Sequence, residues 1–199
     1  MKNNTKYCTY SNFRTKSVHK QKGLSLIEVS IVTAIVLLLA IIAIPAVGSY
    51  VVENKVPKVG EELARFALHT QINAQPGSSL PYADINTGVL AGMVEDSTIF
   101  AVTRSGSTTR VLHGLGNDGA VEVGPSSSGA GFTITLDKVN HAACPSLASV
   151  LQKISDQIII SSMASGDTTV KSDSISYNAL QAESSCTKGD LNTFIFTIS

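Results

Sequence analysis

The sequence LSLIEVSIVTAIVLLLAIIAIPAVGSYVV, residues 24–52, dominates the architecture that we expect for this chain. From Val29 to Val52 it contains no charged residue. As an α-helix this uncharged segment would be about 36 Å long, which exceeds the roughly 30 Å hydrocarbon core of a bilayer. An ordinary secretory signal has a shorter apolar region that is followed by a small-residue cleavage site. We therefore expect residues 24–52 to form a transmembrane helix.

The residues that precede this helix are basic. Residues 1–23 contain six lysines and arginines and no acidic residue, whereas residues 24–199 contain nine basic and fifteen acidic residues. The positive-inside rule predicts that such a leader stays in the cytoplasm and that the residues after the helix are exported. The acidic balance of the exported part gives no support to nucleic-acid binding.

Glu28 is the one charged residue within residues 24–52. A carboxylate near the mouth of an apolar helix is costly in lipid, and such residues usually have a function and a partner. Two interpretations are open on position alone. Glu28 either marks the headgroup boundary or forms an ion pair that the protein needs.

The eight residues 22–29, KGLSLIEV, resemble the processing site of type IV prepilins. That site consists of Gly, a hydrophobic residue, Ser or Thr, two hydrophobic residues and Glu at the start of a long apolar helix, and every position fits. The resemblance implies that prepilin peptidase cuts between Gly23 and Leu24 and methylates the new amino group of Leu24. It also implies assembly roles for Glu28 and Pro45, which would be residues five and twenty-two of the mature chain.

Physical reasoning gives these two assembly residues specific tasks. In a filament, the Glu28 carboxylate would neutralise the terminal ammonium group of a neighbouring subunit, because a buried charge is tolerated when it is paired. Pro45 removes one helical hydrogen bond and allows a kink.

The long leader and the Leu at the mature start resemble the type IVb branch, which includes the bundle-forming and toxin-coregulated pilins. The segment 135–147, TLDKVNHAACPSL, is similar to bundle-forming pilins as well.

After Val52 the expected helix becomes amphipathic and continues through residues 53–76. Apolar residues recur there at spacings of three and four, at positions 52, 56, 59, 63, 66 and 67. We expect Pro76-Gly77 to end a helix of about fifty residues. Residues 77–199 then form a globular head, in which residues 77–110 connect the helix to the first clear strands with short helical or extended pieces.

The head contains alternating patterns that are typical of strands. We expect a hairpin from residues 111–115 and 120–123 around Asn117-Asp118-Gly119, a helix at 145–154, and strands at 132–136, 157–161, 169–174 and 193–198. The predicted fold is α+β: a long N-terminal helix on an antiparallel sheet with an inserted helix.

Three cysteines are present, and Cys8 lies in the leader. A pair of cysteines in an exported domain usually forms a disulfide, so we expect Cys144 and Cys186 to be bonded. The loop between them would stabilise the head by roughly 4 kcal/mol in the chain-entropy model. By resemblance to pilins, residues 144–186 would be exposed on the filament.

Other chemical patterns are weak. Residues 114–119, GLGNDG, fit a dinucleotide fingerprint, but a strand rather than a helix is expected to follow, so a turn explains the glycines. His69, His113 and His141 lack metal-ligand spacing, and the aspartates lack the pattern of a calcium loop. No nucleophile with a base is evident, so we expect neither an enzyme nor a cofactor site.

We therefore expect a structural subunit, the major pilin of a type IVb pilus. Its partners would be further copies of itself, prepilin peptidase, the assembly platform with its ATPase, and an outer-membrane secretin. The precursor would lie in the inner membrane of a Gram-negative bacterium, and the assembled filament would be extracellular. A pseudopilin of a type II-like secretion system and a minor pilin remain alternatives, and a membrane-anchored enzyme is a less favoured one.

Overall fold

The computed structural model describes residues 23 and 25–199 apart from residues 76, 128 and 164, and it leaves out the side chains of residues 44–46. The chain forms four α-helices and seven strands within these residues, together with a 3-10 turn at His141–Ala143. The helices are α1 (Leu26–Ile72), α2 (Thr87–Val94), α3 (Cys144–Leu151) and α4 (Ala179–Ser184). The strands are β1 (Ala101–Ser105), β2 (Thr108–Leu112), β3 (Ala120–Pro125), β4 (Phe132–Val139), β5 (Gln157–Ser162), β6 (Gly166–Lys171) and β7 (Asn192–Ile198).

The chain divides into two compact units, and the boundary falls inside α1. The first unit ends at Ile42, and the second extends from Ala43 to Ser199. In the first unit the described part of α1 carries a nearly uninterrupted apolar sequence whose side chains are exposed. The second unit holds the remaining part of α1 and all seven strands. From here on, the head means this whole unit, Ala43–Ser199, which is larger than the head of residues 77–199 expected from the sequence.

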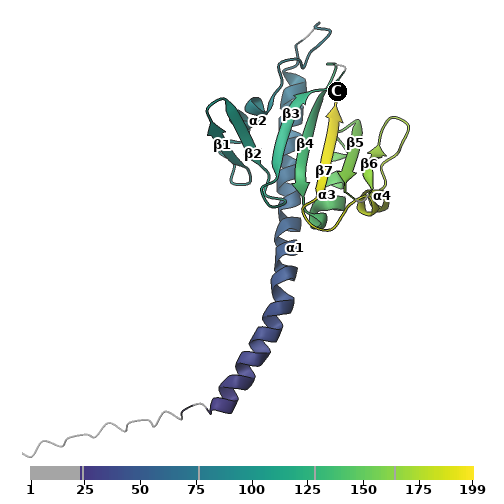
Figure 1. Ribbon diagram of the computed structural model, residues 1–199. Coiled ribbons are helices and arrows are strands. Elements are labelled where there is room, and N and C mark those ends of the chain that lie inside the picture. Colours follow the sequence, from purple (N-terminus) through teal and green to yellow (C-terminus); the bar gives the residue numbers. More distant parts are fainter. Residues whose placement is uncertain (1–22, 24, 76, 128, 164) are drawn as a thin grey trace, which may run out of the picture. The chain divides into compact units, whose positions relative to one another are not determined.

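The strands of the head form one antiparallel sheet in the order β1-β2-β3-β4-β7-β5-β6 (Figure 1). β7 is an inner strand of this sheet and pairs with β4 on one side and with β5 on the other. The pairing of β2 with β3 is short, because it joins only Val111 to Val121 and Leu112 to Ala120. A bulge lies between Leu136 and Val139 in β4, where Lys138 has a positive φ of 48°.

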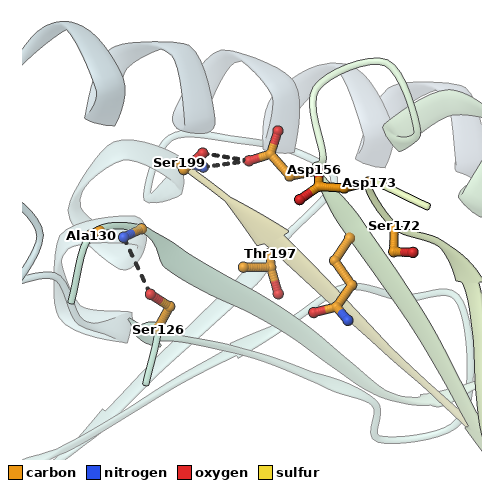
Figure 2. A pocket seen from close by; sticks show the side chains of 9 residues that line it. Ser126, Ala130, Asp156, Ser172, Asp173, Thr197 and Ser199 are labelled. Atoms are coloured by element: carbon orange, nitrogen blue, oxygen red, sulfur yellow. Dashed lines mark hydrogen bonds between the residues drawn. The ribbon is translucent and has the colours of Figure 1, made fainter. Parts of the chain in front are cut away.

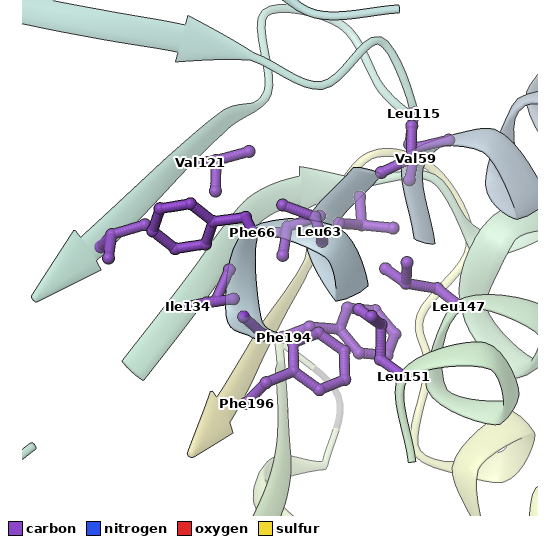
Figure 3. Packing of buried hydrophobic residues seen from close by; sticks show 14 of the residues in the cluster. Val59, Leu63, Phe66, Leu115, Val121, Ile134, Leu147, Leu151, Phe194 and Phe196 are labelled. Atoms are coloured by element: carbon purple, nitrogen blue, oxygen red, sulfur yellow. The ribbon is translucent and has the colours of Figure 1, made fainter. Parts of the chain in front are cut away.

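The core of the head lies between α1 and the sheet (Figure 3). Val59, Leu63 and Phe66 of α1 are fully buried, as the spacing of three and four predicts. Figure 3 shows them among strand residues such as Ile134 and helix residues such as Leu147. Gly60 is buried where α1 meets α3, and a Cβ at this position would come within 2.4 Å of a Val150 methyl group. A glycine that weakens the helix locally therefore permits close packing of two helices.

The predicted α+β architecture is confirmed, with some errors in the placement of elements. Helix α1 ends at Ile72, four residues before Pro76, and α3 ends at Leu151 rather than at residue 154. Strands expected at 132–136, 157–161 and 193–198 are present with small extensions. The expected strand 169–174 was wrong by three residues, because β6 spans Gly166–Lys171. The first strand of the expected hairpin is also misplaced, since β2 ends at Leu112.

Candidate assembly site

The residues around the expected cleavage site precede the first turn of α1. Gly23 is exposed, and a Cβ added to it would meet no heavy atom within 4 Å. Leu24 and Cys8 lie outside the described residues. Ser25 is also exposed and immediately precedes the helix, which begins at Leu26. The two described residues next to Leu24 are therefore both exposed.

Glu28 makes a local contact that the sequence interpretation did not include. The main-chain N–H of Ser25 donates to Oε2 of Glu28 over 3.4 Å. This contact is one half of a capping box, in which an acidic residue three positions into a helix satisfies an orphan N–H at its start. The spacing Ser25-x-x-Glu28 was the signal that could have revealed it. A carboxylate is also favourable here because the helix N-terminus carries a partial positive charge.

Two hydroxyl groups near the start of α1 form hydrogen bonds within the helix itself. Ser30 donates to the main-chain oxygen of Ile27 at 2.8 Å, and Thr33 lies 3.0 Å from the oxygens of both Val29 and Ser30. Buried polar groups are costly in hydrocarbon unless they have partners. These bonds therefore make the segment compatible with an apolar environment despite its hydroxyl groups.

The apolar segment has the length and composition of a membrane span. Within the part of the chain that the structure describes, α1 is the one helix that is long and apolar enough to cross a bilayer. No residue in its most apolar 18-residue window is buried. Large apolar side chains are thus left for lipid or another chain to cover, among them Ile35, Leu37, Leu39 and Ile41.

Pro45, the second expected assembly residue, lies within α1. A proline has no N–H, so it cannot donate the hydrogen bond that other residues of a helix donate to the carbonyl four positions earlier. Its side chain lies outside the described part of the structure. The proposed contribution of Pro45 to bending during assembly therefore stays a prediction.

Cys144 and Cys186 form the predicted disulfide. Their Cα atoms are 6.5 Å apart, which is within the usual range for a disulfide. Cys144 is completely buried at the start of α3, and Cys186 is half-buried just after α4. The bond therefore anchors the segment that includes β5, β6 and α4 to the core of the head.

Residues 113–119 form the β2–β3 loop, and its three glycines have structural roles. Gly114 has a positive φ of 64°. A Cβ at Gly116 would lie 1.8 Å from the main-chain oxygen of Lys138, and one at Gly119 would lie 2.5 Å from the His113 ring. β3 follows this loop, as expected, so the glycines serve a tight connection and the fingerprint geometry of strand, loop and helix does not occur here.

Polar contacts hold the β2–β3 loop against its surroundings. The N–H of Asn117 donates to Oδ2 of Asp190 at 2.8 Å, and Leu115 O accepts from the N–H of Asn140 at 2.9 Å. Asp190 also accepts from the side-chain amide of Asn140. Nearby, the buried side-chain amide of Asn192 donates from its nitrogen to the main-chain oxygens of Val139 and Thr187, and its oxygen accepts from the N–H of Thr187. Neither network was apparent from the sequence.

Two ion-paired acids on the surface have shifted pKa values. Hydrogen bonds and charge attraction from Arg104 lower the pKa of Glu95, and those from Arg110 lower the pKa of Asp118. Both acids are exposed to solvent, so these pairs contribute little to stability. Their position at the β1–β2–β3 end of the sheet indicates a solvated surface.

The head also has a polar pocket of about 280 Å³ at one end of the sheet (Figure 2). In it, the N–H and the hydroxyl group of Ser199 donate to Oδ2 of Asp156 at 2.8 and 2.7 Å. Asp173 and Thr197 line the same pocket. Among the described residues, no group of three or more His, Cys, Asp or Glu side chains is arranged to hold a metal ion.

Comparison with known proteins adds evidence from the other end of the chain. Residues 107–199, just under half of the sequence, match the family described as PilS N terminal. The resemblance to the type IVb pilins is confirmed. This match does not overlap residues 22–52, where the prepilin processing site and the apolar helix carried the resemblance. The family model and the prepilin-like segment therefore concern separate parts of the chain, with residues 53–106 between them.

Two solved structures are similar in fold. The first is a type IVb pilin from Salmonella typhi, which is 21% identical in sequence to this chain. The two structures align with a TM-score of 0.49, and the alignment covers 70% of this chain and 94% of the pilin. The second is TcpA, a type IV pilin from Vibrio cholerae El Tor biotype, which is 16% identical in sequence to this chain. Here the TM-score is 0.42, and the alignment covers 73% of this chain and 99% of TcpA. No curated protein matches the sequence.

Proposed function

We propose that the chain is the major structural subunit of a type IVb pilus, which polymerises through its N-terminal helix. The observation that carries this proposal is the exposed apolar segment of α1, in which Glu28 is the one charged residue between positions 24 and 52. A lipid anchor alone needs the apolar residues, and the carboxylate would serve it only as a cap of the helix N-terminus. A helical polymer needs both, because the same surface packs against other copies and the carboxylate can pair with a terminal ammonium group.

In this proposal the chain passes from membrane to filament in ordered steps. Prepilin peptidase cuts between Gly23 and Leu24 and methylates Leu24 while the head is on the periplasmic side of the inner membrane. An assembly platform with its ATPase then adds the subunit to a homopolymer that leaves the Gram-negative cell through a secretin. The filament serves adhesion, aggregation or mating contact, and the disulfide-bounded residues 144–186 contribute to its outer surface.

Substitution of Glu28 tests this proposal, because two variants separate its capping role from its charge. Glu28→Gln keeps an oxygen that can accept from the Ser25 N–H and removes the charge, whereas Glu28→Val removes both. Loss of one partner from a buried ion pair costs about 3–5 kcal/mol at each subunit addition. We expect both variants to be inserted and cleaved normally and to form few or no surface filaments by electron microscopy.

Glu53→Gln is the matched control, since Glu53 is an exposed acid of the same helix beyond the apolar segment. This variant is expected to form filaments of normal number and length. If Glu28→Gln assembles as well as the wild type while Glu28→Val does not, Glu28 acts as a helix cap and the ion-pair mechanism is wrong. Normal filaments from both variants would contradict the proposal that assembly requires the Glu28 carboxylate.

Mass spectrometry of protein from its host tests processing independently of assembly. The expected mature chain begins at methylated Leu24 and lacks Cys8. Gly23→Ala is expected to leave uncut precursor in the membrane. Assembled filaments that retained residues 1–23 would contradict the proposed maturation.

A further inference from the structure

His113 is a completely buried histidine in the β2–β3 loop, residues 113–119. Its Nδ1 atom accepts a hydrogen bond from the main-chain N–H of Leu115 at 3.0 Å. Its Nε2 atom lies 2.8 Å from the main-chain oxygen of Asp137. Because an amide N–H only donates and a carbonyl oxygen only accepts, these partners require a neutral ring with its proton on Nε2.

Protonation of Nδ1 is incompatible with this arrangement. The imidazolium ring has a second N–H, which would point at the N–H of Leu115, and that buried amide would lose its acceptor. The surroundings leave little freedom for adjustment. The N–H of His113 donates to Gly119 O at 3.1 Å, and the ring contacts Gly119 so closely that this residue has no room for a Cβ.

The charged groups around the ring come from several elements. Asp137 of β4 and Asp190 of the segment before β7 favour the charged ring, while Lys55 of α1, whose Nζ donates to Gly114 O at 3.4 Å, adds positive charge beside the loop. Asp118 is paired with Arg110 and Lys138. Burial is the largest influence, and it lowers the pKa of His113 below 6.5 despite the two aspartates.

We propose that the β2–β3 loop is an acid-sensitive latch, which opens when His113 takes up a proton. Opening would release two contacts made by the loop: that of Gly114 with Lys55 on α1, and that of Asn117 with Asp190. The latch therefore joins α1 to the segment that follows the disulfide. This inference concerns the head alone and does not depend on filament assembly.

The direction of the pH effect follows from proton linkage. In the open loop a solvated histidine has a pKa of about 6.5, which is above that of the closed state, so the open state binds more protons. The closed loop is fully stable above this pH and loses stability as the pH falls below it. The opening constant should rise about fivefold from pH 6.5 to 5.5 and about tenfold for each further pH unit, until the pKa of the closed state is reached.

Hydrogen exchange of the full chain in detergent micelles measures this opening. Exchange of the Leu115 and Asn117 amides, corrected for the intrinsic effect of pH, is expected to be nearly constant from pH 7.5 to 7.0 and about fivefold faster at pH 5.5 than at pH 6.5. His113→Gln should abolish this rise, because a glutamine does not titrate. His69→Gln is the matched control, since His69 is exposed on α1, and it should keep the wild-type profile.

Two results would overturn the proposal: a flat exchange profile in the wild type, or an unchanged rise in folded His113→Gln. If His113→Gln does not fold, nitrogen chemical shifts of the wild-type histidines replace it. They should show His113 as the neutral Nε2–H tautomer at pH 6.5. A charged ring or the other tautomer at that pH would refute the latch.

Discussion

Phe66 of α1 meets Phe132 of β4 edge-on, with ring centroids 6.2 Å apart and ring planes at 89°. Both side chains are buried, and this arrangement directs the edge of one ring at the face of the other. The contact joins the amphipathic part of the helix to the middle of the sheet. It also connects two segments that are 66 positions apart in the sequence.

Truncation of this helix anchor should destabilise the head strongly. Phe66→Ala leaves a cavity between helix and sheet and is expected to lower the free energy of unfolding by about 3–5 kcal/mol. Chemical denaturation of the full chain in micelles, followed by circular dichroism, measures the change. Leu68→Ala, at a side chain that is 52% exposed on the same helix, should change stability by less than about 0.5 kcal/mol. Equal effects of both substitutions would contradict the packing described.

Removal of the buried amide of Asn192 should also lower the free energy of unfolding. Asn192→Ala deprives the main chain of Val139 and Thr187 of hydrogen-bond partners, and we expect a loss of about 2–4 kcal/mol in the same assay. Asn178→Ala provides a comparison, because Asn178 only caps the short helix α4 at the surface. That cap is worth about 1 kcal/mol. A smaller effect at Asn192 than at Asn178 would show that the buried network is not needed.

Two glycines, Gly116 of the β2–β3 loop and Gly124 of β3, allow a paired test of whether a glycine is required for lack of space. Gly116→Ala places a Cβ 1.8 Å from the main-chain oxygen of Lys138, which cannot move away easily, and should cost at least about 2–3 kcal/mol. Gly124→Ala in β3 meets no atom within 4 Å and should leave stability unchanged or raise it by about 0.5 kcal/mol. Thermal unfolding of the two variants side by side distinguishes these outcomes.

Loss of the disulfide should reduce the amount of exported protein. Cys186→Ser opens a bond between residues 42 positions apart. The chain-entropy model predicts a loss of about 4 kcal/mol, so less folded protein should accumulate after export. Cys8→Ser is the control and should have no effect if the leader is removed. Non-reducing peptide mapping should find the Cys144 and Cys186 peptides joined, and free alkylation of both thiols would disprove the bond.

The sequence predicted those elements whose apolar residues follow a single period. The stripe on α1 recurs at helical spacing, and the alternation in β4 and β7 matches their buried and exposed residues. β6 was misplaced because its polar sequence contains one buried residue, Val170, and so carries no alternating pattern. α4 was missed for the same reason, since only Ala182 of its six residues is buried.

The candidate assembly site was predictable as a set of residues but less so as a set of contacts. The processing pattern identified Glu28, yet its bond to Ser25 depends on where the helix begins. The β2–β3 loop was expected to be a turn, while its contacts with Asp137 and Asp190 join it to segments that are distant in sequence. Periodicity carries no information about such contacts, because they arise from tertiary packing.

The position of β7 in the sheet also sets the order of events during biosynthesis. β7 is the last of the seven strands to be translated, and it pairs with both β4 and β5. Until residues 192–198 have been synthesised, strands β1–β4 and the hairpin β5–β6 are separate fragments with unpaired edges, which attract aggregation and proteolysis. A chain interrupted before Asn192 would keep these edges unpaired, so the sheet can be completed only in a chain that contains β7.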